Sequence, residues 1–154
     1  MTDITVDLNG YRVNLRVAAI VTHGADVLLC RLPQFDCWFL PGGRVKTNED
    51  SYTAIQRELN EEIGVGFDVI RPVITAENFF ELEGHHFHEL CTFYEVAWSA
   101  GEIQSTRKGS DELFEWIPRE RLCDMVLKPD FIKEHIVNPR PGFELIIHRD
   151  PGLT

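Results

Sequence analysis

Three glutamates near the middle of the chain have a spacing that suits carboxylate chemistry. Glu58, Glu61 and Glu62 are related by i, i+3 and i+4, which places their side chains on one face of a helix. Like charges at this spacing destabilise a helix by tenths of a kcal/mol per pair, and anions in a last helical turn are disfavoured by about 0.3 to 1 kcal/mol. The arrangement suits a bound cation better than it suits stability, because Mg²⁺ prefers oxygen ligands.

An isolated run of acids on a helix is most often a solvated face, so the surrounding residues must decide between the two interpretations. Residues 43–65 satisfy the pattern G-x5-E-x7-R-E-U-x-E-E-x-G-U, in which U is an aliphatic residue. The specified positions are filled by Gly43, Glu49, Arg57, Glu58, Leu59, Glu61, Glu62, Gly64 and Val65. This segment resembles the Nudix box, and Pro41-Gly42 and residues 114–118 also resemble features of that family.

The resemblance implies a fold, a reaction and a metal ion. The implied fold is α+β, an α/β/α sandwich with a mixed β-sheet between helices, and we expect residues 1–154 to form a single domain. The implied activity is hydrolysis of a diphosphate linkage in a small nucleotide-like substrate. The implied cofactor is Mg²⁺, with Mn²⁺ as the second candidate.

Matching the box position by position gives the roles that the resemblance implies. Glu58, Glu61 and Glu62 correspond to the ligands of the divalent metal, and Gly43 corresponds to the glycine whose backbone approaches it. Arg57 corresponds to the arginine that orients a neighbouring glutamate, for which its planar fork is suited. The implied catalytic residues are Arg57, Glu58 and Glu61. The general base is one of the box glutamates or a carboxylate elsewhere.

Candidates outside the box carry weaker signals. Asp111 and Glu112 lie before an expected strand, where a similar loop in relatives often contributes an additional acid, although a solvated loop fits the sequence equally well. Further possible bases, stacking rings, metal ligands and phosphate contacts carry still weaker signals. A core or solvent role is favoured for most of them. They are Glu83 and Glu89; Phe79, Phe80, Phe87, Tyr94 and Trp38; His85, His86 and His88; and Lys46, Arg31, Arg107 and Lys108.

Caps and periodicity predict the elements that position these residues. Asn48 suits an N-cap and Gly64 suits the C′ position, so we expect a helix over residues 49–63, with Glu49 in its first turn. We expect strands at 11–21, 27–32, 37–40, 67–74, 87–98, 114–117 and 143–148, a loop at 81–86, a helix starting at Pro118 and a short helix at 129–136.

Composition limits the classes of partner. Fifteen basic and 25 acidic residues give a net charge of −10, the wrong sign for holding nucleic acid by counterion release. We therefore expect no long nucleic acid as a partner, and RNA decapping is disfavoured. No signal-peptide layout is found, and no apolar run approaches the roughly 20 residues of a membrane span. We expect a cytoplasmic protein without a membrane partner, a homodimer by default, and four structural cysteine thiols.

Two classes of function compete. The favoured one is a pyrophosphohydrolase that acts on a nucleoside diphosphate linked to another moiety, such as ADP-ribose or a nucleotide sugar, or on a nucleoside triphosphate. The alternative is a Nudix-fold nucleotide-binding or regulatory module without catalysis, and the complete box argues against it because such modules usually lose these glutamates. An isoprenoid diphosphate isomerase is also disfavoured, since the cysteine motif of that relative is not found.

Overall fold

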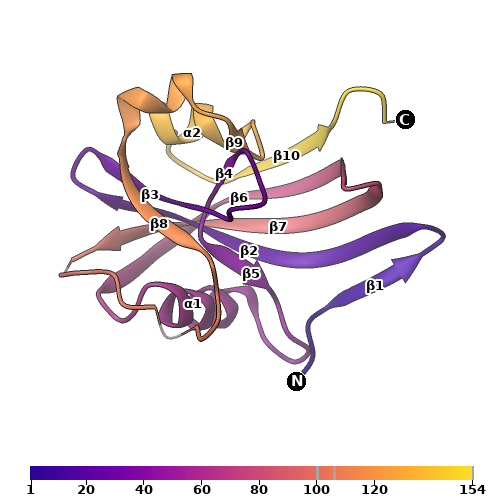
Figure 1. Cartoon of the computed structure of the whole chain (residues 1–154), viewed down its shortest axis with the longest axis horizontal. Helices are drawn as coiled ribbons and strands as arrows, with labels where there is room; N and C mark the ends of the chain where they lie inside the picture. Colours follow the sequence, from indigo (N-terminus) through magenta and orange to yellow (C-terminus); the bar gives the residue numbers. More distant parts are fainter. Residues whose placement is uncertain (100, 106, 154) are drawn as a thin grey trace.

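The fold is given by a computed structural model, which describes residues 1–99, 101–105 and 107–153. In this part of the chain ten strands form one mixed sheet, against which two α-helices and a 3₁₀ helix pack (Figure 1). The strands are β1 (Thr5–Leu8), β2 (Tyr11–His23), β3 (Asp26–Arg31), β4 (Trp38–Phe39), β5 (Gly42–Arg44), β6 (Phe67–Leu82), β7 (His85–Trp98), β8 (Leu113–Pro118), β9 (Leu127–Lys128) and β10 (Glu144–Arg149). The helices are α1 (Ser51–Glu62), η1 (Arg119–Asp124) and α2 (Ile132–Val137).

Strand pairing brings distant parts of the sequence together. The main path through the sheet is β10-β6-β7-β2-β3-β4-β9, while β1 and β5 pair with β2 and β8 pairs with β3. β2 runs parallel to β7 and antiparallel to β5, and Val17 of β2 lies opposite Gly43 of β5. Because α1 follows β5 after a short connection, this pairing holds the start of the box against the middle of the sheet.

Two apolar cores lie on opposite faces of the sheet. On one face, α1 buries Ile55 and Leu59 against residues of β2 and β7. On the other face, Leu122 of η1 and Ile132 of α2 are buried in a second core that includes Phe93 of β7. Figure 1 shows α1 and α2 on opposite sides of the strands. The expected α+β class, with a mixed sheet between helices, is therefore confirmed.

The helix that carries the glutamates starts later than expected. Its N-cap is Asp50, whose side chain accepts a hydrogen bond of 2.7 Å from the backbone N–H of Thr53. The expected cap, Asn48, has φ +64 and lies in the turn before the helix. Glu49 also lies before the helix, where its carboxylate accepts from the N–H of Lys46. Gly64 has φ +94 just beyond the C-cap, as the sequence predicted.

The expected loop at residues 81–86 is wrong, because β6 and β7 form one long hairpin. Only Glu83 and Gly84 lie outside the strands, with φ +52 and +77, and two successive positive φ angles match the twist of antiparallel strands. The histidines at positions 85, 86 and 88 therefore belong to β7, and not to a solvated turn. The turn is therefore two residues long, where a loop of six was expected.

The remaining elements differ from expectation at their ends. Pro118 ends β8 and precedes a 3₁₀ helix instead of an α-helix, and the helix expected at 129–136 begins at Ile132. The strands β1, β5 and β9 were not predicted; β5 and β9 have only three and two residues, too few to show an alternating pattern. No helix among the described residues is both long and apolar enough to cross a membrane.

Candidate active site

The three box glutamates differ in their exposure. The side chains of Glu58 and Glu62 are 7% and 1% exposed, whereas that of Glu61 is 40% exposed. One oxygen of Glu62 accepts a hydrogen bond of 3.0 Å from the backbone N–H of Gly42. Burial of two carboxylates one helical turn apart is costly without cationic or hydrogen-bonding partners, so the neighbouring groups matter.

Gly43 is required by its contact with Glu58. A Cβ added at this position would overlap the Glu58 carboxylate. The backbone of Gly43 is not in the left-handed region, so its φ angle does not require a glycine. The glycine therefore provides space and not an unusual φ angle. Its backbone is close to the carboxylate of Glu58.

Arg57 ties the start of the box to the glutamates. Its Nε and Nη2 donate to the two oxygens of Glu49, at 2.7 and 2.9 Å, and its Nη1 donates to Glu58 Oε1 at 2.7 Å. Nη2 also donates to the carbonyl of Arg44 in β5. The hydrogen bonds from Arg57 lower the pKa of Glu49. This network fixes the orientation of Glu58 relative to the sheet.

Arg107 lies at the centre of the cluster, a position that the sequence analysis did not predict. Its Nη2 donates to Glu58 Oε2 at 2.7 Å and lies 3.4 Å from Glu61 Oε2. Its Nη1 lies 3.0 Å from Glu62 Oε1 and 3.5 Å from Glu112 Oε2. From the sequence, Arg107 was a weak candidate for a phosphate contact in a glycine- and charge-rich loop, and a solvated role was favoured.

The electrostatics of the cluster are dominated by burial. Burial and the adjacent Glu112 carboxylate raise the pKa of Glu62 to about 8, and Arg107 opposes this shift. The same carboxylates raise the pKa of Arg107 above its ordinary value, against the effect of its own burial. Because burial and the neighbouring acids disfavour the ionised form of Glu62, a cation close by favours ionisation of the cluster.

The donor set fits a divalent metal ion by its chemistry. Four carboxylates surround one guanidinium, and oxygen ligands of this kind are those that Mg²⁺ and Mn²⁺ prefer. Within the described residues, however, no three acidic, histidine or cysteine side chains already converge on a space that could hold a metal ion. Glu58, Glu61 and Glu62 now contact the Arg107 guanidinium. They could hold a metal ion if their carboxylates bound the ion in place of that guanidinium.

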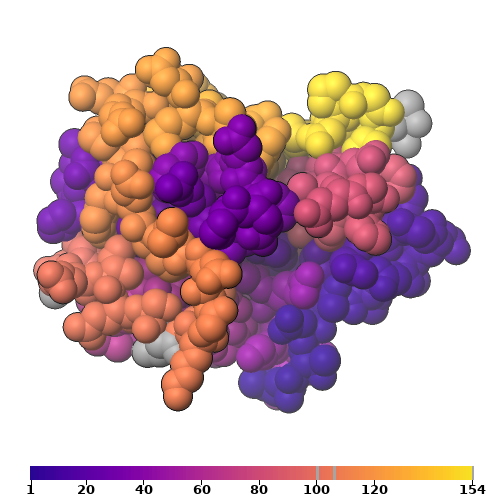
Figure 2. All heavy atoms as spheres, in the orientation of Figure 1, coloured from indigo at the N-terminus to yellow at the C-terminus, as the bar shows by residue number. Residues whose placement is uncertain are grey.

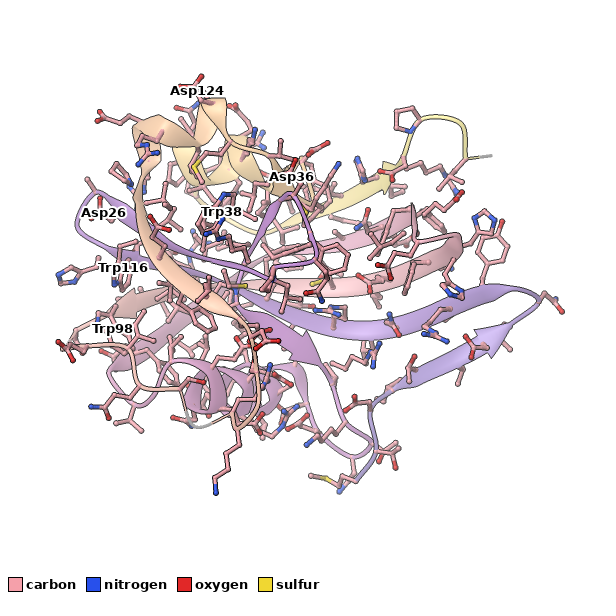
Figure 3. The ribbon with its side chains drawn as sticks, in the orientation of Figure 1. Asp26, Asp36, Trp38, Trp98, Trp116 and Asp124 are labelled. Carbon is pink, nitrogen blue, oxygen red and sulfur yellow. The ribbon has the colours of Figure 1, made fainter. Side chains whose placement is uncertain are left out.

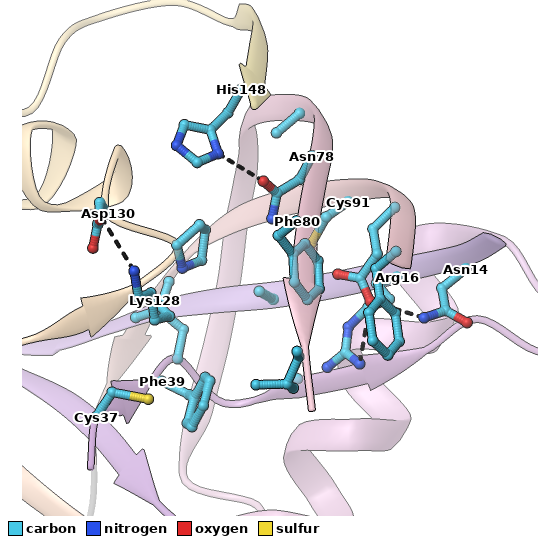
Figure 4. Close-up of a pocket in the computed structure, with 18 of the residues that line it drawn as sticks. Asn14, Arg16, Cys37, Phe39, Asn78, Phe80, Cys91, Lys128, Asp130 and His148 are labelled. Atoms are coloured by element: carbon cyan, nitrogen blue, oxygen red, sulfur yellow. Dashed lines mark hydrogen bonds and ion pairs between the residues drawn. The ribbon is translucent and has the colours of Figure 1, made fainter. Parts of the chain in front are cut away.

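A cavity of about 420 Å³, some of whose lining residues are drawn in Figure 4, is bordered by two acids of the cluster. Glu62 and Glu112 line it, so the acids face the same space as its other walls. Further lining residues include Asn78, which is hydrogen-bonded to His148 of β10 at 2.8 Å, and Lys128, which contacts Asp130 at 3.3 Å. This volume lies within the range of about 300 to 1,000 Å³ typical of small-molecule sites.

The cavity lies where several parts of the chain meet. Besides residues of β2, β5, β10 and α1, its lining includes parts of the segment 30–40, the β6–β7 hairpin, and residues 112 and 128–131. Figure 2 shows the first segment (dark purple) on the face between the β8–η1 region (orange) and the hairpin (pink). Trp38 belongs to this side of the molecule, whereas Trp98 and Trp116, with rings 6.3 Å apart, lie together on another (Figure 3).

The two loop acids considered as bases are separated by the structure. Glu112 lines the cavity and its side chain is 18% exposed, whereas Asp111 is exposed on the surface. Glu83 lies in the exposed hairpin turn. Glu89 also lines the cavity, but it is buried and accepts a hydrogen bond of 2.8 Å from Asn14. Glu112 is therefore the loop acid nearest to the chemistry that the cluster could support.

The aromatic candidates fall into two groups. Phe80 and Phe87 stack on each other with ring centres 4.9 Å apart, and both line the cavity. Tyr94 is buried in the core, Phe79 lies beneath the guanidinium of Arg149, and Trp38 lies beneath that of Arg31.

The histidine and lysine candidates are dispersed. His85 is exposed, His86 is 3.9 Å from Glu81, and His88 packs on Phe79, so these histidines form no metal cluster among the residues described. Lys108 is exposed. Lys46 meets Glu49 through its backbone N–H.

Comparison with known proteins adds independent information. A family model described as NUDIX domain matches residues 12–137. The chain is 32% identical over 83 residues to the RNA pyrophosphohydrolase of Ruthia magnifica subsp. Calyptogena magnifica. The aligned segment covers 54% of this chain and 46% of that protein. It is 35% identical over 66 residues to the RNA pyrophosphohydrolase of Blochmanniella pennsylvanica (strain BPEN). That aligned segment covers 43% of this chain and 42% of that protein. The chain thus spans less than half the length of these relatives.

The solved structures support the fold. The NUDIX hydrolase from Nitrosomonas europaea is similar with a TM-score of 0.67 and 18% identity, over 89% of this chain and 79% of that one. At this identity the likeness concerns the fold alone.

Proposed function

Because the chain belongs to the NUDIX domain family, we propose that it hydrolyses a diphosphate linkage in a small nucleotide-like substrate with the help of a divalent metal ion, Mg²⁺ or Mn²⁺. The substrate class is a nucleoside diphosphate linked to another moiety, such as ADP-ribose or a nucleotide sugar, or a nucleoside triphosphate. One observation carries the proposal: a cluster of four glutamates opens onto a cavity of about 420 Å³ through Glu62 and Glu112.

The roles follow from the contacts. Glu58, Glu61 and Glu62, with the backbone of Gly43, would hold the metal, which when bound activates water and neutralises phosphate charge. Arg57 keeps Glu58 in place through its bond to Oε1. We assign the collection of the water's proton to a carboxylate that faces the cavity.

Glu112 is the proposed proton acceptor among the loop acids. It faces the cavity from the segment before β8. Its carboxylate contacts Arg107 of the cluster at 3.5 Å. It is therefore less constrained than Glu58, which bonds two arginines at 2.7 Å. A base has to be free to approach water, and this favours Glu112 over Glu58 for that step.

A triphosphorylated RNA 5′ end is a second candidate substrate. It is supported by the names of the curated relatives, which are RNA pyrophosphohydrolases. The net charge of −10 opposes it, because a long polyanion gains affinity from basic surfaces. The absence of long nucleic acid as a partner, the homodimer and the cytoplasmic location stay predictions.

A substrate panel tests the proposal. Purified protein would be incubated with Mg²⁺ or Mn²⁺ and ADP-ribose, nucleotide sugars, nucleoside triphosphates or a 5′-triphosphorylated RNA oligomer, and the phosphorylated products identified by mass spectrometry. We expect metal-dependent cleavage of a diphosphate linkage in a small substrate. Cleavage of the RNA alone would shift the substrate class, and binding without cleavage of any compound would favour a regulatory module.

A further inference from the structure

We propose that Arg107 is a resident counter-cation of the glutamate cluster, and that a divalent metal ion binds there by displacing its guanidinium. The inference concerns regulation of metal loading and rests on the proposed function, since it needs the cluster to be the metal site. It starts from the number of acids that a single side chain contacts. Arg107 meets Glu58, Glu61, Glu62 and Glu112 from one loop.

The oxygens of the two buried glutamates are divided between two kinds of partner. Glu58 Oε1 bonds Arg57 of the box, and Glu62 Oε2 bonds the N–H of Gly42, the residue just before the box. Glu58 Oε2 and Glu62 Oε1 bond Arg107, which lies outside it. Removing the Arg107 guanidinium would therefore free one oxygen on each glutamate and leave the other oxygen held in place.

A metal ion and this guanidinium cannot share those oxygens. Both are cations, so they repel at short range, and the Arg107 nitrogens lie 2.7 and 3.0 Å from the oxygens concerned. Metal binding must then include the energy of breaking the Arg107 ion pairs, and the apparent affinity falls in proportion.

The displacement involves the side chain more than the backbone. The N–H of Arg107 donates to the carbonyl of Glu61 at 3.2 Å, and the N–H of Gln104 donates to the carbonyl of Ile63 at 3.0 Å. Ser105 Oγ also donates to the Glu61 carbonyl. These bonds attach the segment to the C-terminal carbonyls of α1 and can persist when the guanidinium leaves. The same anchors keep Arg107 close enough to return when the metal dissociates.

Metal titration without nucleotide tests the proposal. Isothermal titration calorimetry with Mn²⁺ would compare the wild type, Arg107→Met and the control Lys108→Met, which removes an exposed charge from the next position. We expect Arg107→Met to bind Mn²⁺ at least about threefold more tightly, because no guanidinium competes. In EDTA the same variant should have a lower Tm than wild type, since four acids lose their counter-ion. Lys108→Met should match wild type in both measurements.

The outcomes separate the two proposals. Equal or weaker Mn²⁺ binding by Arg107→Met overturns the inference and leaves the proposed function standing. No Mn²⁺ binding by either protein overturns the metal-dependent function itself. If Arg107→Met is unfolded in EDTA and folds on addition of Mn²⁺, the counter-cation role is supported. Arg107→Lys then supplies the affinity comparison, and it should bind Mn²⁺ more tightly than wild type because one ammonium cannot bridge four carboxylates.

Discussion

Arg57 holds both oxygens of Glu49 through Nε and Nη2, at 2.7 and 2.9 Å, and the same guanidinium reaches Glu58 at 2.7 Å. A lysine ammonium cannot reproduce this planar set of bonds. We therefore expect Arg57→Lys to lower kcat by about ten- to a hundredfold, the usual cost of losing a residue that supports a ligand. Steady-state kinetics with saturating Mg²⁺ would measure it. Arg12→Lys, at an exposed ion pair with Asp7, is the control and should leave kcat unchanged.

Glu62→Gln removes one ionisable carboxyl group from the cluster at almost constant volume. The glutamine oxygen can still accept the hydrogen bond from Gly42, so the fold should be retained and Tm in EDTA should not fall. We expect turnover to fall by about a hundredfold or more, because a metal ligand is weakened. Asn60→Ala, at an exposed position of the same helix, serves as the control. Normal turnover of Glu62→Gln with Mg²⁺ would remove Glu62 from the site.

Gly43→Ala tests the contact between the box loop and Glu58. The added methyl group would overlap the Glu58 carboxylate, which must then move. We expect Mn²⁺ affinity and turnover to fall together, by about tenfold or more. Gly24→Ala places its Cβ in open space at a turn with φ +59, so it should affect stability only. Full activity of Gly43→Ala would show that Glu58 can shift without consequence.

Asn78→Leu tests the far wall of the cavity. Asn78 is buried, lines the cavity and accepts a hydrogen bond from His148. Replacing its amide removes a polar group from the binding space and leaves the glutamates untouched, so we expect KM to rise about threefold or more with little change in kcat. A lower kcat at unchanged KM would instead link this wall to the chemical step.

His135 predicts how stability depends on pH. Its side chain is 5% exposed in α2, its Nδ1 has no hydrogen-bond partner in the described structure, and burial lowers its pKa. The folded state therefore binds fewer protons than the unfolded state below about pH 6.5, and stability is lost as the pH falls through that range. Tm measured at pH 7.5 and 5.5 should fall less in His135→Leu than in wild type. An equal fall in both proteins would contradict the prediction.

The sequence predicted the parts of the site that lie within one continuous segment. The box spacing placed Glu58 and Glu62 on one helix, and Gly64 ended that helix as expected. The N-terminal end was wrong because Asn48 and Asp50 are both good caps, and sequence spacing does not show which side chain reaches a free backbone N–H. Short strands such as β9 were missed because their pairing is set by tertiary contacts.

Arg107 could not be predicted in the same way. It is 45 residues beyond Glu62 and comes from a loop without periodicity, so only the folded chain shows the contact. Its position also changes the interpretation of the glutamates, whose mutual repulsion was expected to be relieved only by a metal. In the structure Arg57 and Arg107 neutralise much of that charge. The unfavourable placement of acids at the end of α1 is therefore compensated before any metal binds.

Part of the cavity wall comes from residues that lie beyond the segment matched by the family model. The family match stops at residue 137, whereas His148 and Asp150 line the cavity from β10 and the residue after it. Substitutions in that C-terminal segment could change which leaving group fits while the box residues stay the same. Two proteins with identical boxes could then break the same kind of bond in different metabolites. Membership of the family thus informs the reaction more than it informs the choice of molecule.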